Sequence, residues 1–95
     1  MRKNTRQTVE AFLEGKARRP ANSIWTNGDH IWSYGTMLVE RHPTDPRSLV
    51  FNATKYSPTT SQHQRGLRAV LEKQYHLTIV TGCPFGVSDL YNHGA

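Results

Sequence analysis

NATKYSPTTSQHQ, residues 52–64, joins a predicted strand to a predicted helix, and this junction decides the fold. The apolar run at residues 49–51 before it is typical of a buried strand. After it, Leu67, Val70 and Leu71 recur at the spacing of one helical face. Hydrogen-bonding side chains fill the junction more densely than a simple connection needs. We therefore predict a polar site there, either a binding surface or a structural joint.

The start of the predicted helix carries several residues that can cap it. Ser57 before Pro58 fits an N-cap followed by proline at the first helical position, while Thr59, Thr60 or Ser61 would also serve as the cap. The N-terminus of a helix presents free N–H groups and a partial positive charge. A phosphate or an acidic side chain of a partner is therefore the ligand expected here.

A short helix is predicted at residues 5–14, because Val9, Phe12 and Leu13 share one face. Gly15 is a natural end for it. A basic connector follows, so residues 1–22 are expected to form a helix plus this connector.

Strands are predicted at residues 23–27 and 30–40, with an Asn27-Gly28 hairpin turn between them. A proline-containing loop then leads to a third strand at residues 48–56, which gives a three-stranded antiparallel meander. Residues 76–81 are rich in β-branched side chains and could add a late edge strand.

These elements predict one α+β domain over residues 1–95, with the longer helix packed on the sheet. Residues 23–81 are expected to form its core, and residues 82–95 an irregular tail with a frayed end. A chain of 95 residues has room for one small core.

Charge favours phosphate-rich or acidic partners. Twelve Lys and Arg against seven Asp and Glu give a formal net charge of +5, and the mean hydropathy is -0.66. This balance excludes an acidic mimic of nucleic acid. Simple solubility of a small basic domain explains the same charge equally well.

Catalysis, metal binding and cofactors are not expected. The five histidines and Cys83 show no local metal-ligand spacing. Cys83 precedes Pro84 with no basic neighbour that would activate its thiol. A third and weaker alternative is an enzyme that uses His63 in acid–base chemistry, for which the sequence has no supporting motif. One cysteine excludes an internal disulfide. Neither a signal peptide nor a membrane span is predicted, so a soluble intracellular protein is expected.

Arg65 and Arg68 lie opposite the apolar stripe of the second predicted helix, and Lys55 precedes that helix. Together with a second basic cluster near residue 18, they favour contact with nucleic acid through its phosphates. A solvated helical face is the simpler explanation for any single one of them. The predicted partner-binding residues are Lys55, Ser57, Thr59, Thr60, Ser61, His63, Gln64, Arg65 and Arg68, with Lys16, Arg18 and Arg19 as the second cluster.

The aromatic residues Trp25, Trp32, Tyr34 and Tyr56 lie on or beside the predicted strands. They could stack on nucleic-acid bases. A small domain needs its large aromatic side chains in the core, so we expect most of them to be buried.

The pattern N-x-T-x-Y-S-x-T-T-S-x-H-Q, which begins at Asn52, resembles small uncharacterised proteins of bacteriophages and other mobile elements. The likeness covers roughly residues 30–71. It implies a phage setting and therefore the cytoplasm of a host cell. Small basic phage proteins commonly act by binding, so the resemblance implies an accessory protein that binds nucleic acid or an acidic host protein or ribonucleoprotein. The alternative that it implies is an anti-CRISPR or other anti-defence inhibitor acting by protein–protein binding.

Overall fold

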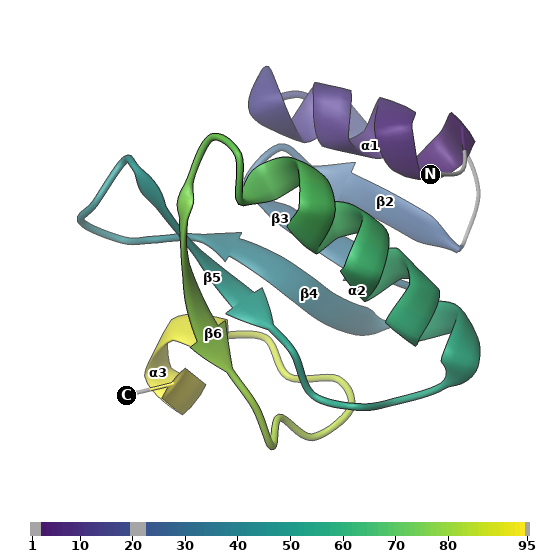
Figure 1. Ribbon diagram of the computed structural model, residues 1–95, viewed down its shortest axis with the longest axis vertical. Helices are drawn as coiled ribbons and strands as arrows, with labels where there is room; N and C mark the ends of the chain where they lie inside the picture. The colour runs from purple at the N-terminus through teal and green to yellow at the C-terminus, as the bar shows by residue number, and fades with distance from the viewer. Residues whose placement is uncertain (1–2, 20–22, 95) are drawn as a thin grey trace.

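The computed structural model describes residues 3–19 and 23–94, which form three helices and one six-stranded sheet (Figure 1). The strands lie in the sheet in the order in which they occur in the chain. In chain order the elements are α1 (Lys3–Leu13), β1 (Ala17–Arg18), β2 (Ile24–Asn27), β3 (His30–Ser33), β4 (Thr36–Arg41), β5 (Ser48–Asn52), α2 (Pro58–Leu71), β6 (His76–Val80) and α3 (Leu90–Gly94). The α+β class and the two predicted helices are confirmed.

The sheet has six strands, so the predicted three-stranded meander covers only part of it. Strands β1 to β5 pair antiparallel in sequence, and β6 pairs parallel with β5 after the crossover through α2. The expected late strand is therefore present at one edge of the sheet. At the other edge, two residues of the predicted basic connector form β1. The third predicted strand ends at Asn52 rather than at residue 56.

The segment predicted as one strand over residues 30–40 is a hairpin. Ser33 of β3 pairs with Thr36 of β4, which leaves Tyr34 and Gly35 as the turn. Tyr34 adopts a φ of 54°, a left-handed conformation that residues other than glycine rarely take. The prediction of one strand was wrong because a Tyr-Gly pair lacks the usual composition of a hairpin turn.

The hairpin between β2 and β3 is confirmed, but its turn lies one residue later than predicted. Thr26 pairs with Ile31, so Gly28 and Asp29 make the turn. The side chain of Asn27 accepts hydrogen bonds from the backbone N–H groups of Asp29, at 2.9 Å, and His30, at 2.8 Å. An asparagine in this position caps the turn with its side chain, and the positive φ falls to Gly28.

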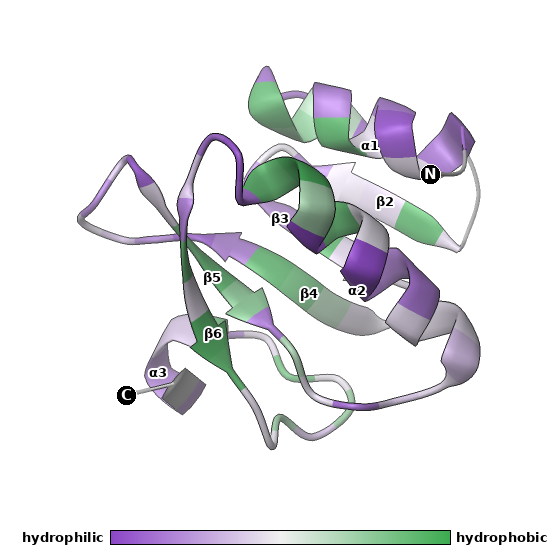
Figure 2. Ribbon diagram, in the orientation of Figure 1, coloured by the Kyte–Doolittle hydropathy of each residue, from purple (hydrophilic) through white to green (hydrophobic). Residues whose placement is uncertain are grey.

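Both faces of the sheet are covered by the chain itself. Helices α1 and α2 pack on one face through Val9, Phe12, Leu67 and Leu71 (Figure 1). Figure 2 shows that hydrophobic residues predominate along β4, β5 and β6, which lie between the two covering layers.

The second face is covered by the segment that follows β6. Cys83 and Leu90 pack there against Met37, Val50 and Val80. Residues 82–89 form neither helix nor strand, so the irregular part of the predicted tail over residues 82–95 is confirmed, but the frayed end is wrong for the residues up to 94. Residue 95 lies outside the described residues. The segment contributes buried side chains and ends in α3, because a sheet with two apolar faces needs a cover on each.

Candidate nucleic-acid interface

The side chain of Asn52 is the centre of the hydrogen-bond network in the junction between β5 and α2. Its side chain is fully buried, and its Nδ2 donates to the carbonyl of Met37 at 2.9 Å and to the hydroxyl of Tyr56 at 3.0 Å. Its Oδ1 accepts from the backbone N–H of Thr54 at 3.0 Å. The amide thus holds the chain as it leaves the sheet, and it has no bonding capacity pointed toward solvent.

The same junction anchors the segment that covers the second face of the sheet. The hydroxyl of Tyr56 donates to the carbonyl of Cys83 at 2.7 Å, and the backbone N–H of Cys83 donates to Oγ1 of Thr54 at 3.0 Å. Two side chains of the junction therefore bind both backbone groups of one residue 27 to 29 positions further along the chain.

Ser57 is the N-cap of α2, which settles the choice among the capping residues. Its Oγ accepts from the backbone N–H of Thr60 at 3.2 Å, and Pro58 is the first helical residue. The first turns of α2 are also tied to β3, since the hydroxyl of Ser33 lies 3.3 Å from that of Thr60 and 2.7 Å from Nδ1 of His63.

Burial divides the predicted partner-binding residues of the junction into two groups. Thr60, His63 and Gln64 are only 4, 3 and 9% exposed, so most of each side chain lies inside the protein. Thr59 and Ser61 are half-buried. The exposed residues are Ser57, whose hydroxyl caps the helix, and the three cations Lys55, Arg65 and Arg68.

The three cations surround one groove of about 260 Å³ between the end of β5 and α2. Arg65 and Arg68 project from the same face of α2 because they are three residues apart. Lys55 approaches from the connection that leaves β5. We call this groove the phosphate groove after the ligand that the sequence leads us to expect; its lining residues are Phe51, Ala53, Lys55, Ser61, Gln64, Arg65 and Arg68.

Positive charge in the phosphate groove is largely uncompensated. Arg68 forms an exposed ion pair with Glu72 at 3.8 Å. Within the described residues, no acidic side chain pairs with Lys55 or Arg65. Two cations of the groove therefore keep their charge available for an anion from outside.

The second predicted cluster lies at the opposite edge of the sheet, on and beside β1. Lys16 pairs with Glu14 at 3.4 Å, and Arg18 donates to Gln7 at 2.6 Å. The guanidinium of Arg19 lies 4.6 Å from the ring centre of Trp25. These cations already have partners in their own chain, and the sheet separates them from the phosphate groove.

Trp25 and Trp32 stack on each other, which occupies one ring face of each. The rings of Trp25 and Trp32 lie 4.1 Å apart at an angle of 11°, and Arg19 covers the other side of Trp25. Trp25 also donates through Nε1 to the carbonyl of Tyr34 at 2.9 Å. Both residues are half-buried, whereas we expected most of the aromatic residues in the core. Mutual stacking uses one of the two ring faces of each tryptophan on which a base could stack.

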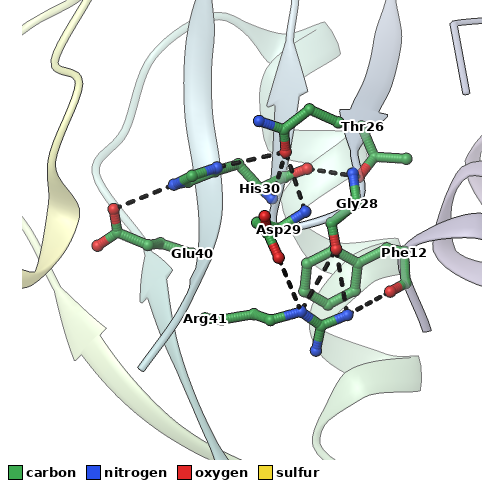
Figure 3. Close-up of polar contacts among 8 residues, drawn as sticks. Phe12, Thr26, Gly28, Asp29, His30, Glu40 and Arg41 are labelled. Atoms are coloured by element: carbon green, nitrogen blue, oxygen red, sulfur yellow. Dashed lines mark hydrogen bonds and ion pairs between the residues drawn. The ribbon is translucent and has the colours of Figure 1, made fainter. Parts of the chain in front are cut away.

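A further polar network, which no local sequence motif predicts, joins β3 and β4 (Figure 3). His30 lies 3.3 Å from Glu40, and Arg41 donates to the carbonyls of Gly28 and Phe12 while its guanidinium lies 4.2 Å from the Phe12 ring centre. Arg41 thereby gives a second donor to the carbonyl of Phe12, which also accepts from the backbone N–H of Gly15 at 3.0 Å at the C-terminus of α1. A cavity of about 510 Å³ lies beside this network.

That cavity offers no evident chemistry of its own. Arg41 lies 3.7 Å from Asp29, and His30 lies 3.3 Å from Glu40, which also accepts from the backbone N–H of Tyr91 at 3.0 Å. No cluster of three His, Cys, Asp or Glu side chains suited to a metal ion occurs among residues 3–19 and 23–94. Strand pairing brings the residues of the network together from distant positions, so nothing close in sequence marks them.

No protein family, no curated protein and no solved structure matches this chain. Within the described part of the chain, no helix has the length and apolar character needed to cross a membrane.

Proposed function

We propose that this protein is a small non-catalytic accessory protein that binds nucleic acid, or a host nucleoprotein, through phosphate contacts in the phosphate groove. The observation that carries this proposal is the gathering of Lys55, Arg65 and Arg68 around one groove, with no acidic partner for the first two among the described residues. The net charge of +5 supports it through long-range attraction.

Phosphate contacts make two demands that the phosphate groove meets. They need cations that approach the backbone without first breaking an internal ion pair, which favours Lys55 and Arg65 over Lys16 and its Glu14 partner. They carry no sequence information themselves, so a surface without base-reading side chains suffices. The resemblance to phage proteins implies that the cytoplasm of a host cell is where this activity occurs.

Salt dependence of binding tests the proposal. The affinity for a fluorescent oligonucleotide should fall steeply with salt, because each neutralised phosphate releases counterions. Replacing Arg65 and Arg68 by Ala should weaken binding and reduce the slope of log affinity against log salt by roughly one unit for each phosphate that is no longer neutralised. Fluorescence anisotropy at several salt concentrations measures both quantities.

A charge-matched control separates specific contact from general attraction. Lys16→Ala with Arg18→Ala also removes two positive charges, but at the opposite edge of the sheet. This variant should keep the wild-type slope. If it loses binding while Arg65→Ala with Arg68→Ala does not, the second cluster is the site and the phosphate groove is not.

A protein-directed anti-defence inhibitor is the second candidate function. Tyr34 and Phe85 are 49 and 72% exposed; Tyr34 lies in the turn between β3 and β4, and the Phe85 ring lies next to Gly35 of the same turn. Exposed aromatic side chains are typical anchors of protein interfaces. This function predicts that Phe85→Ala abolishes inhibition of a host defence complex, whereas Arg65→Ala with Arg68→Ala does not.

A further inference from the structure

We propose that the phosphate groove receives one unstacked base of a single-stranded nucleic acid and binds an amino group of that base at Oε1 of Gln64. This inference rests on the proposed function and names its substrate class. The base would enter the groove, and the cations around it would hold the neighbouring phosphates.

The amide of Gln64 is fixed in one orientation. Its Nε2 donates to the carbonyls of Asn52 and Thr54, both at 2.8 Å. Only the nitrogen of an amide can donate to two carbonyls, so both of its protons are used and the orientation is determined by chemistry.

This orientation leaves an acceptor without a partner. Within the described residues, no donor is bonded to Oε1 of Gln64. The side chain is 9% exposed and lines the phosphate groove, so the free oxygen belongs to a held, nearly buried group. Among the described residues, Oγ1 of Thr8 is the only fully buried side-chain N or O atom without a partner, so Oε1 of Gln64 is open to solvent and a donor from a ligand can reach it.

The phosphate groove provides an apolar surface next to this acceptor. The half-buried Ala53 and the aliphatic stems of Lys55, Arg65 and Arg68 line it, whereas Phe51 is only 1% exposed. A flat heterocycle buries its faces favourably against such a surface. The fixed acceptor suits the hydrogen-bonding edge of a base, the apolar lining suits its ring face, and the surrounding cations suit the phosphates next to it.

Size excludes the paired and stacked bases of a duplex from entering this groove. A volume of about 260 Å³ lies below the roughly 300 Å³ at which ligand pockets for drug-sized molecules begin. It suits one base and no more. A base of a duplex must leave its pair and its stack to enter, whereas a single strand avoids most of that cost.

The free acceptor also predicts which bases bind well. Cytosine presents an exocyclic amino group that projects beyond its ring and is not flanked by two carbonyl oxygens. The N–H of thymine lies between two carbonyl oxygens, which would approach Oε1 of Gln64 and repel it. Because both are pyrimidines of similar size and stacking, they form a matched pair of probes.

Binding of labelled oligo-dC, oligo-dT and a mixed-sequence duplex at one salt concentration and neutral pH tests the inference. We expect oligo-dC to bind roughly tenfold more tightly than oligo-dT, the value of one hydrogen bond to a fixed acceptor. The duplex should bind more weakly than oligo-dC. Equal affinity for oligo-dC and oligo-dT, or tighter binding of the duplex, would overturn the inference and leave the proposed function intact.

Two variants complete the test. Ser61→Leu fills the groove from a helical position that tolerates leucine, and it should remove the preference for oligo-dC while the salt slope for the duplex stays unchanged. If Gln64→Met folds, it should also remove the preference for oligo-dC and leave the salt slope for the duplex unchanged. If it does not fold, Ser61→Leu alone provides the test. A preference that survives Ser61→Leu contradicts the inference. Absence of binding to every probe contradicts the proposed function itself.

Discussion

The hydroxyl of Ser33 and Nδ1 of His63 lie 2.7 Å apart inside the protein, where they tie the end of β3 to the first turns of α2. His63 is 3% exposed and Ser33 is fully buried. The imidazole is therefore part of the joint between sheet and helix. A direct contact between His63 and a docked phosphate, which its sequence position had suggested, does not fit this burial.

Replacing His63 by Ala should lower the free energy of unfolding by about 1–3 kcal/mol, because the buried hydroxyl of Ser33 loses a partner. Urea unfolding measures this change. His76→Ala is a suitable control, since His76 is exposed on β6 and its replacement should leave stability nearly unchanged. Unchanged stability of His63→Ala combined with lost binding would instead make His63 a contact residue.

Asn52 should contribute more to stability than His63, because its side chain forms hydrogen bonds with three groups. Asn52→Ala leaves the carbonyl of Met37 and the N–H of Thr54 without their side-chain partner, so we expect a loss of about 2–4 kcal/mol from two such groups. Lys55→Ala, three residues away and exposed, should change stability by less than about 0.5 kcal/mol. Equal melting of the two variants would show that the Asn52 bonds do not hold the junction.

Cys83 reports on how the junction holds the segment after β6. It is the only cysteine of the chain and is 3% exposed, so its reaction with a thiol reagent requires local opening. Tyr56→Phe removes the hydroxyl that donates to the carbonyl of Cys83. The labelling rate of Cys83 should therefore rise several-fold, in proportion to a loss of about 1 kcal/mol in local stability.

The same measurement on Tyr91→Phe provides the control, because Tyr91 lies on α3 and its exposed ring carries a hydroxyl outside the junction. Its labelling rate should match that of the wild type. Equal rates for Tyr56→Phe and wild type would mean that packing of Leu90 and its neighbours alone holds the segment in place.

Local signals in the sequence predicted the helices well. The spacing of Val9, Phe12 and Leu13 marked α1, and Ser57 before Pro58 marked the start of α2, because caps and faces depend on residues close in sequence. The cations around the phosphate groove followed from the same helical spacing.

Long-range contacts escaped prediction. The cover of the second face depends on Cys83 and Leu90 meeting strands about 30 to 50 residues earlier, and nothing local in residues 82–94 indicates this. The fixed amide of Gln64 likewise needs the carbonyls of Asn52 and Thr54, whose positions only the fold provides. The turn at Tyr34 was not predicted, because a tyrosine rarely adopts the positive φ that this residue has.

Gly28 joins the turn between β2 and β3 to the end of α1, and this contact can be tested with a matched pair of glycines. Gly28 has a φ of 99°, and a Cβ there would lie 2.6 Å from the carbonyl oxygen of Gly15. Gly86 has a φ of 80°, and a Cβ there would meet nothing within 4 Å. Both positions strain an alanine backbone, but only Gly28 adds a steric clash with another part of the main chain.

Gly86→Ala should therefore cost about 1–2 kcal/mol from the left-handed backbone alone. Gly28→Ala should cost more than this, because the clash with Gly15 must push α1 away from the turn, where Arg41 also binds the carbonyls of Gly28 and Phe12. Thermal unfolding of the two variants compares these losses, and hydrogen exchange in α1 should rise in Gly28→Ala only. Equal losses without increased exchange in α1 would show that the turn accommodates a side chain and does not position the helix.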